Sequence, residues 1–145
     1  MTASLGPSRL SRLALEAMEP FAPIDVTLGV VTSPRGLSGL RMDLSGAILL
    51  ICQRCMMPLE IDVGRRALFE MVDSAAALDA DDDEHWDRML HSDRFDLLQI
   101  VEDELLLALP YSARHATCEP AGTPAVIAKA MPFAGLALLR EHKHD

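Results

Sequence analysis

Apolar residues recur at helical spacing near the start of the chain and again between about residues 96 and 109. The first stripe is narrow and Pro20 ends it; its members are Leu10, Leu13, Ala14, Ala17 and Met18. The second is stronger, because Asp96 is placed to cap a helix, Gln99 follows three residues later as in a capping box, and Pro110 closes it. The pattern predicts one short helix and one central helix.

The central helix has more apolar surface than one packed face requires. An arc of about one third of its circumference should pack on a sheet; this arc holds Leu97, Leu98, Val101, Leu105, Ala108 and Leu109. Leu106 and Leu107 project away from the arc, so the C-terminal half of the helix is apolar nearly all round. Another segment or a partner must cover such a surface. Leu106 and Leu107 are therefore candidate partner-binding residues.

After Pro34 and Gly36 the apolar period changes to two, as in half-buried β-strands. Four segments have strand patterns: 40–44, 47–51, 59–63 and 67–72. Ser45 and Gly46 are expected to form a turn between the first two. We therefore predict an α+β fold, in which an antiparallel meander or small sheet is packed by the central helix.

The composition changes near residue 118, which suggests a boundary. Residues 119–131 contain two prolines and a glycine among alanines, as in a linker. Residues 132–145 are expected to form a short helix followed by a tail. A helix of under three turns is marginal in isolation, so this one docks either on its own domain or on a partner. The prediction is one α+β domain over residues 1–118, a linker and a terminal helix.

Composition places the chain among compact proteins without a membrane segment. Half of its 145 residues are apolar, and a domain of this size buries roughly two thirds of its unfolded surface. The longest unbroken apolar run, 47–52, is far shorter than the ~20 residues of a membrane span, and the N-terminus lacks a signal-peptide pattern. Three cysteines fit poorly with a secreted disulfide framework. We expect a cytoplasmic protein with reduced thiols.

The net charge of −9 is concentrated in one region. Between Leu78 and Glu104, eleven acidic residues stand against two arginines, whereas the rest of the chain is neutral. The densest run is Asp81, Asp82, Asp83 and Glu84. Such a surface repels phosphate backbones at long range and favours basic proteins as partners, although a charge run can also be a plain solvated loop.

All three cysteines belong to a split pair of motifs. Two residues separate Cys52 from Cys55, and two residues separate His115 from Cys118. Fifty-nine residues lie between the two pairs. A tetrahedral zinc ion takes four thiolate or imidazole ligands, so one Cys3His site can join the two segments. Cys52 and Cys55 are expected at a hairpin tip, where turn amides can donate to thiolates.

Two catalytic alternatives fit the sequence less well. A thioredoxin-type Cys-x-x-Cys opens a helix, whereas this one follows a strand and is followed by Pro58. The four acids of residues 81–84 can in principle hold Mg2+ for a nuclease, but four consecutive acids lack the separated, rigid supports of a two-metal site. His85 and His91 are expected to be exposed loop residues. We predict no catalytic residues.

Several of these motifs, in this order, resemble the YceD-like bacterial proteins. They are the Cys-Gln-Arg-Cys hairpin, the acidic loop, the run 96–110, the pair His115 and Cys118, and the tail 132–139. The resemblance implies a large ribosomal RNA subunit accumulation protein, involved in synthesis, processing or stability of 23S ribosomal RNA. It implies no known catalytic mechanism, and it leaves bound zinc open.

An acidic chain with this role is expected to act as an adaptor. In that hypothesis the acidic loop attracts a basic ribosomal or assembly protein, the apolar surface supplies burial, and zinc holds the hairpin. A direct contact with precursor ribosomal RNA is the alternative, and it would use Arg54, Arg65 and Arg66 near one edge of the sheet. No small-molecule substrate is expected.

Overall fold

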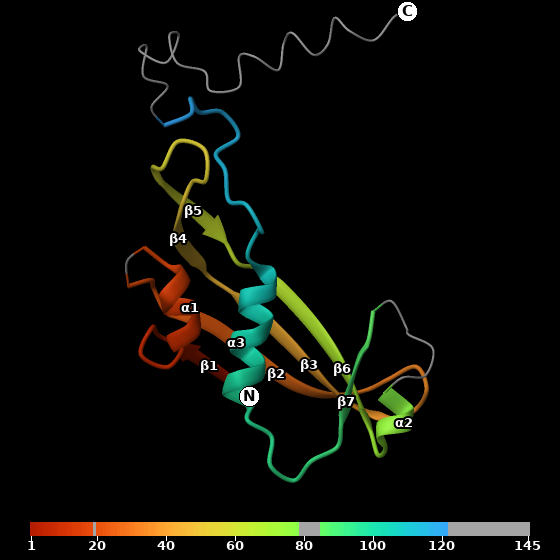
Figure 1. The fold of residues 1–145 in the computed structure, drawn as a ribbon. Coiled ribbons are helices and arrows are strands. Elements are labelled where there is room, and N and C mark those ends of the chain that lie inside the picture. Colours follow the sequence, from red (N-terminus) through yellow and green to blue (C-terminus); the bar gives the residue numbers. More distant parts are fainter. Residues whose placement is uncertain (19, 79–84, 122–145) are drawn as a thin grey trace, which may run out of the picture.

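The fold comes from a computed structural model that describes residues 1–18, 20–78 and 85–121 (Figure 1). In chain order its elements are β1 (Thr2–Leu5), α1 (Ser11–Glu16), β2 (Ile24–Thr32), β3 (Ser38–Ser45), β4 (Ala47–Ile51), β5 (Pro58–Asp62), β6 (Arg65–Val72), α2 (Ala75–Leu78), β7 (Asp87–Leu90) and α3 (Leu97–Ala108). Both predicted helices of the domain and all four predicted strands are present. The α+β class is confirmed.

The larger sheet has five strands in the order β1-β2-β3-β6-β7. All neighbours are antiparallel except β6 and β7, which run parallel. Strands β1, β2 and β7 were not expected from the sequence. For β2 a signal existed, because Ile24, Val26 and Leu28 are buried and alternate with polar residues as in other half-buried strands.

Strands β3 to β6 form one long hairpin, and this corrects the expected meander. Leu44 pairs with Arg65 in the large sheet, and Ala47 pairs with Asp62 in the separate β4-β5 sheet, so the register is the same on both sides of the break. The N–H of Val63 donates to the carbonyl of Gly46 at 2.9 Å across the break. The predicted turn at Ser45 and Gly46 is therefore wrong. Gly46 alone lies between β3 and β4, and a hairpin needs at least two loop residues.

Helices α1 and α3 lie side by side over one face of the large sheet (Figure 1). Their buried side chains meet those of the sheet in one core, which includes Leu10, Leu13, Val26, Met42, Leu44, Phe69, Val101 and Leu105. Asp96 caps α3 as predicted, since its carboxylate accepts from the N–H groups of Leu98 and Gln99, both at 3.1 Å. Within residues 1–18, 20–78 and 85–121, no helix has the length and apolar character to cross a membrane.

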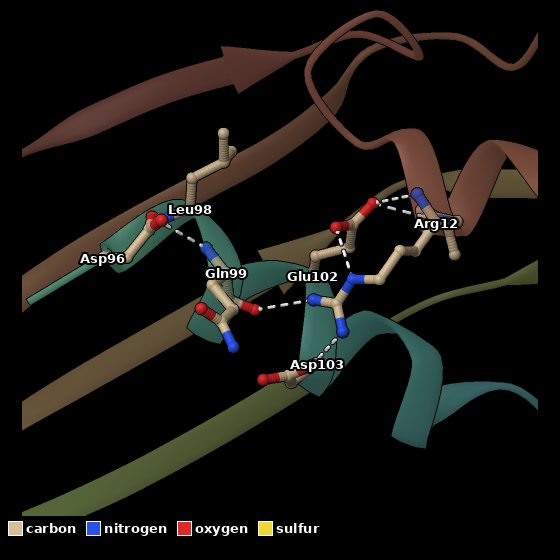
Figure 2. Close-up of polar contacts among 7 residues, drawn as sticks. Arg12, Asp96, Leu98, Gln99, Glu102 and Asp103 are labelled. Atoms are coloured by element: carbon tan, nitrogen blue, oxygen red, sulfur yellow. Dashed lines mark hydrogen bonds and ion pairs between the residues drawn. The ribbon is translucent and has the colours of Figure 1, made fainter.

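Two glutamates of α3 are buried, although the helical periodicity placed them outside the arc that was expected to pack on the sheet. Glu102 accepts from the backbone N–H of Arg12 at 2.6 Å, from that of Leu13 at 3.1 Å, and from the Arg12 guanidinium at 2.8 Å (Figure 2). It therefore caps α1, which has no side-chain cap of its own. Glu104 accepts from Arg65 of β6 at 2.9 Å. These pairs join α3 to α1 and to the sheet.

Candidate metal centre

The tip of the long hairpin carries the first two candidate ligands, as predicted. Cys52 follows β4 directly, and its N–H donates to the carbonyl of Met57 at 2.9 Å while its carbonyl accepts from Met56 at 2.9 Å. Met56 has a φ of 60°, in the left-handed region that non-glycine residues enter mainly in turns. The tight turn brings the side chains of Cys52 and Cys55 to the same side.

The segment after α3 brings the other two ligands to this tip. The N–H of Gln53 donates to the carbonyl of Ala113 at 2.8 Å, and the N–H of Ala121 donates to the carbonyl of Arg54 at 2.9 Å. Between these two tethers, His115 donates its N–H to the sulfur of Cys52 at 3.4 Å. The backbone itself therefore holds the two distant segments together.

The four side chains converge with the spacing of a tetrahedral site. Their ligand atoms all lie within 4.8 Å of one another. The sulfurs of Cys52 and Cys118 are 3.8 Å apart, and the Cys55 sulfur is 3.4 Å from Nδ1 of His115. A tetrahedron with ordinary zinc bond lengths has edges of about 3.8 Å between two sulfurs and about 3.6 Å between sulfur and nitrogen. The donor set and the spacing therefore fit zinc.

Hydrogen bonds at the tip favour the thiolate form of Cys52. Burial of this side chain raises its pKa, but donation from the backbone of Cys55, His115 and Arg54 outweighs burial and lowers the pKa of Cys52 to about 5. For Cys55, the backbone N–H of Met57 lowers the pKa, whereas desolvation and the neighbouring thiols raise it, and the net pKa is raised. Metal binding requires thiolates, so Cys52 is the ligand best prepared for it.

Arg54 is turned toward the cluster. Its Nε donates to the sulfur of Cys118 at 2.9 Å, and its Nη2 donates to the carbonyl of His115 at 2.8 Å. The Cys118 sulfur raises the pKa of the guanidinium above its ordinary value. A zinc ion with three thiolates carries one negative charge, which Arg54 would balance. The sequence proposed Arg54 as a partner or RNA contact, and nothing in its pattern indicated this neighbour.

The other predicted residues are placed as follows. Arg65 pairs with Glu104 at 2.9 Å and Arg66 pairs with Asp43, so both are already bound to carboxylates. The acids of residues 81–84 lie outside the described residues, as do the predicted linker from residue 122 onward and residues 132–145. Leu106 is half-buried against the core, whereas Leu107 is exposed. His85 and His91 are exposed, as expected.

The geometry disfavours dithiol redox chemistry at the hairpin tip. Cys52, Cys55 and Cys118 are free thiols. Cys52 follows a strand and lies in a β-turn, so no helix N-terminus lowers its pKa as in the thioredoxin arrangement. Within the described part of the chain, this cluster is the one group of three or more histidine, cysteine or acidic side chains arranged to hold a metal ion.

Comparison with known proteins confirms the family resemblance. The family model described as "Large ribosomal RNA subunit accumulation protein YceD" matches residues 40–139, which is more than half of the chain. The match includes both halves of the Cys3His cluster and all of α3. Neither the comparison with curated proteins nor that with solved structures gave a match.

Proposed function

Because the chain belongs to the YceD family, whose name implies a role in the accumulation of large-subunit ribosomal RNA, we propose that it is a non-enzymatic acidic adaptor. In this role it binds a basic ribosomal or assembly protein, and that partner contacts the 23S ribosomal RNA or its precursor. The protein would thereby support synthesis, processing or stability of this RNA without breaking a covalent bond.

The main support for the proposal is that the three arginines needed for direct RNA binding already bind acceptors within the protein. Arg54 donates to Cys118 and to the carbonyl of His115, while Arg65 and Arg66 pair with Glu104 and Asp43. A guanidinium already held by a protein acceptor gains less from a phosphate, because the first contact must be given up or shared. This favours a protein partner over direct RNA binding.

Charge distribution supports the same choice. The net charge of −9 coincides with the charge of the region between Leu78 and Glu104. A one-signed surface region raises the encounter rate with oppositely charged partners and repels nucleic acid. We assign the first contact with the partner to Asp81, Asp82, Asp83 and Glu84.

In the proposed function, zinc has a structural role. The four ligands leave no open coordination position for a substrate, which is the arrangement of structural sites. Bound zinc would hold the β4-β5 tip against residues 113–121. The chemistry that it supplies is this cross-link, and the surrounding N–H donors and Arg54 stabilise the thiolates that the cross-link needs.

Binding measurements with two matched triple variants test the adaptor. The variant D81N/D82N/D83N should bind a basic large-subunit ribosomal protein about tenfold or more weakly at low salt, since three charges near the contact are removed. The control E60Q/D62N/D73N removes the same charge from other positions and should bind nearly as well as the parent. The difference between the two variants should shrink as salt rises, because exposed charges are screened.

Assays with RNA could contradict the adaptor hypothesis. Under the proposal, binding to free precursor RNA is weak for all of these proteins. Tight RNA binding that is lost when Arg54, Arg65 and Arg66 are replaced by alanine would overturn the adaptor in favour of direct recognition. Protein-dependent cleavage of precursor RNA with added Mg2+ would overturn the non-enzymatic part.

A further inference from the structure

An apolar groove lies between α1, the end of β4 and the C-terminal end of α3. It has a volume of about 590 Å3, which is in the range of pockets that enclose drug-sized molecules. Its walls come from residues 15–18, 50, 51, 53, 106, 107, 109–111 and 113. The groove therefore has room for several side chains of a covering segment.

Exposed apolar side chains are concentrated at this groove. Five of the eleven large hydrophobic residues that are exposed in the described part of the chain line it: Leu15, Met18, Ile51, Leu107 and Tyr111. Leu15 is 84% exposed and Leu107 is 70% exposed. Single exposed apolar residues are normal, but a contiguous set of them marks a surface that is covered in the working protein.

The described part of the chain ends close to the groove. The N–H of Ala121 donates to the carbonyl of Arg54 at 2.9 Å, and the neighbouring Gln53 lines the groove. Residues 122–131 can span up to roughly 33–36 Å when extended. The next eight residues, 132–139, can therefore reach the groove. A second apolar hollow, lined by Val30, Leu40, Phe95 and Leu97, lies at the N-terminal end of α3, away from the groove.

The composition of this segment matches the groove. Residues 132–139 are Pro-Phe-Ala-Gly-Leu-Ala-Leu-Leu, without a charged or strongly polar side chain. Residues 122–140 contain Lys129 and Arg140 and no acid, whereas Glu16 is the one charged residue among the described residues that line the groove. The family match extends to residue 139 and so includes the whole apolar segment. Polarity and charge both agree with this occupant.

We propose that residues 132–139 of this chain dock in the apolar groove formed by α1, β4 and the end of α3. The contact is intramolecular, so the tether at Ala121 gives residues 132–139 a high effective concentration at the groove. It assigns Leu107 to an internal contact, in place of the partner contact expected from the sequence, and it does not depend on the adaptor function.

Photochemical cross-linking of the full chain tests the docking. In the probe protein Phe133 is replaced by p-benzoylphenylalanine, so one aromatic side chain takes the place of another. Irradiation of the purified protein should give a product of monomer mass, with the cross-link mapped to residues 15–18 or 106–111. Placing the same photoreactive residue at His142 is the control and should give no specific product in the groove.

A groove variant provides the second half of the test. Leu15→Asp together with Leu107→Asp should abolish the monomeric cross-link, and both sites are exposed enough to leave the fold intact. In the chain without the photoreactive residue, Leu136→Asp with Leu139→Asp should increase amide hydrogen exchange in residues 15–18 and 106–111.

Several outcomes would overturn the docking. They are a cross-linked dimer, which would make a second copy the occupant; products mapped outside the groove; and unchanged hydrogen exchange in the Leu136→Asp, Leu139→Asp variant. Cross-links that form only in cells, to another protein, would assign the groove to a partner and would also refute an intramolecular contact.

Discussion

Single side chains join the elements of this fold, and Glu102 of α3 does so at the start of α1. Burial raises the pKa of its carboxyl, but the Arg12 guanidinium and the N–H groups of Leu13 and Arg12 outweigh burial, so the pKa lies below its ordinary value. The carboxylate thus stabilises the start of α1 and its contact with α3 (Figure 2). A charged group in this position makes stability depend on pH.

Glu102→Gln should lower the free energy of unfolding at pH 7 by ~1–2 kcal/mol, because the charge-assisted hydrogen bonds weaken while the shape is kept. The contribution of the carboxylate is fully present above the unfolded-state pKa of about 4.3 and is lost as pH falls through the lower folded-state pKa. The difference between parent and variant should therefore shrink toward pH 3. Urea unfolding between pH 7 and pH 3 measures it.

The matched control is Asp103→Asn. Asp103 also binds Arg12, at 2.6 Å, but its side chain is 45% exposed. An exposed ion pair contributes little, so this variant should lie within about 1 kcal/mol of the parent at every pH. An equal loss in both variants would contradict the special position of Glu102.

The large sheet depends on close approach between neighbouring elements at Gly39 of β3. A Cβ atom there would lie 2.6 Å from the carbonyl oxygen of Phe69 on β6 and 2.8 Å from the ring of Trp86. The Phe69 carbonyl cannot move freely, because Phe69 belongs to the strand paired with β3. Glycine is therefore needed for packing at this point, since its backbone approaches β6 too closely for any side chain.

Gly39→Ala should destabilise the protein by roughly 1–3 kcal/mol, the usual cost of overpacking. Gly29→Ala in the adjacent strand β2 is the control, because its new methyl group would meet only the Arg41 side chain at 3.8 Å. Chemical unfolding of the two variants side by side measures the difference. Equal stabilities would show that β6 and Trp86 can shift without cost.

At the scale of the whole molecule, the Cys3His cluster joins two distant segments of the chain. Cys52 and Cys118 are 66 residues apart in sequence, and their sulfurs are 3.8 Å apart. The hairpin tip extends beyond the five-stranded sheet (Figure 1), and in the β4-β5 sheet Ile48 and Leu50 belong to the buried core. A two-stranded hairpin alone is marginal in water, so the tip needs the cross-link more than the sheet does.

Protein purified without a histidine tag should contain about one zinc per chain, in line with the four-ligand site. Chelation or Cys118→Ser should lower the thermal midpoint and increase hydrogen exchange in residues 47–62 and 113–121 more than in β2 and β3. Elemental analysis and exchange mass spectrometry make the two measurements. His142→Ala with His144→Ala should keep the zinc, and a reduced parent protein without zinc would refute the site.

Much of the architecture could be predicted because its signals are local. The cap at Asp96 and the strand alternation of residues 59–63 depend on neighbours in sequence, so α3 and β5 were identified. Strands β1 and β7 have four residues each and no pronounced alternation. They are strands only because β2 and β6 offer unpaired edges, which local patterns do not record.

The candidate metal site was also predictable only in part. The identity and spacing of Cys52, Cys55, His115 and Cys118 by themselves determined which donors are available and what metal suits them. Only the tertiary structure decided that Arg54 faces Cys118, that Glu102 is buried, and that α1, β4 and α3 leave an apolar groove. Donor chemistry belongs to the residue, whereas burial and pairing depend on which distant segments the fold brings together.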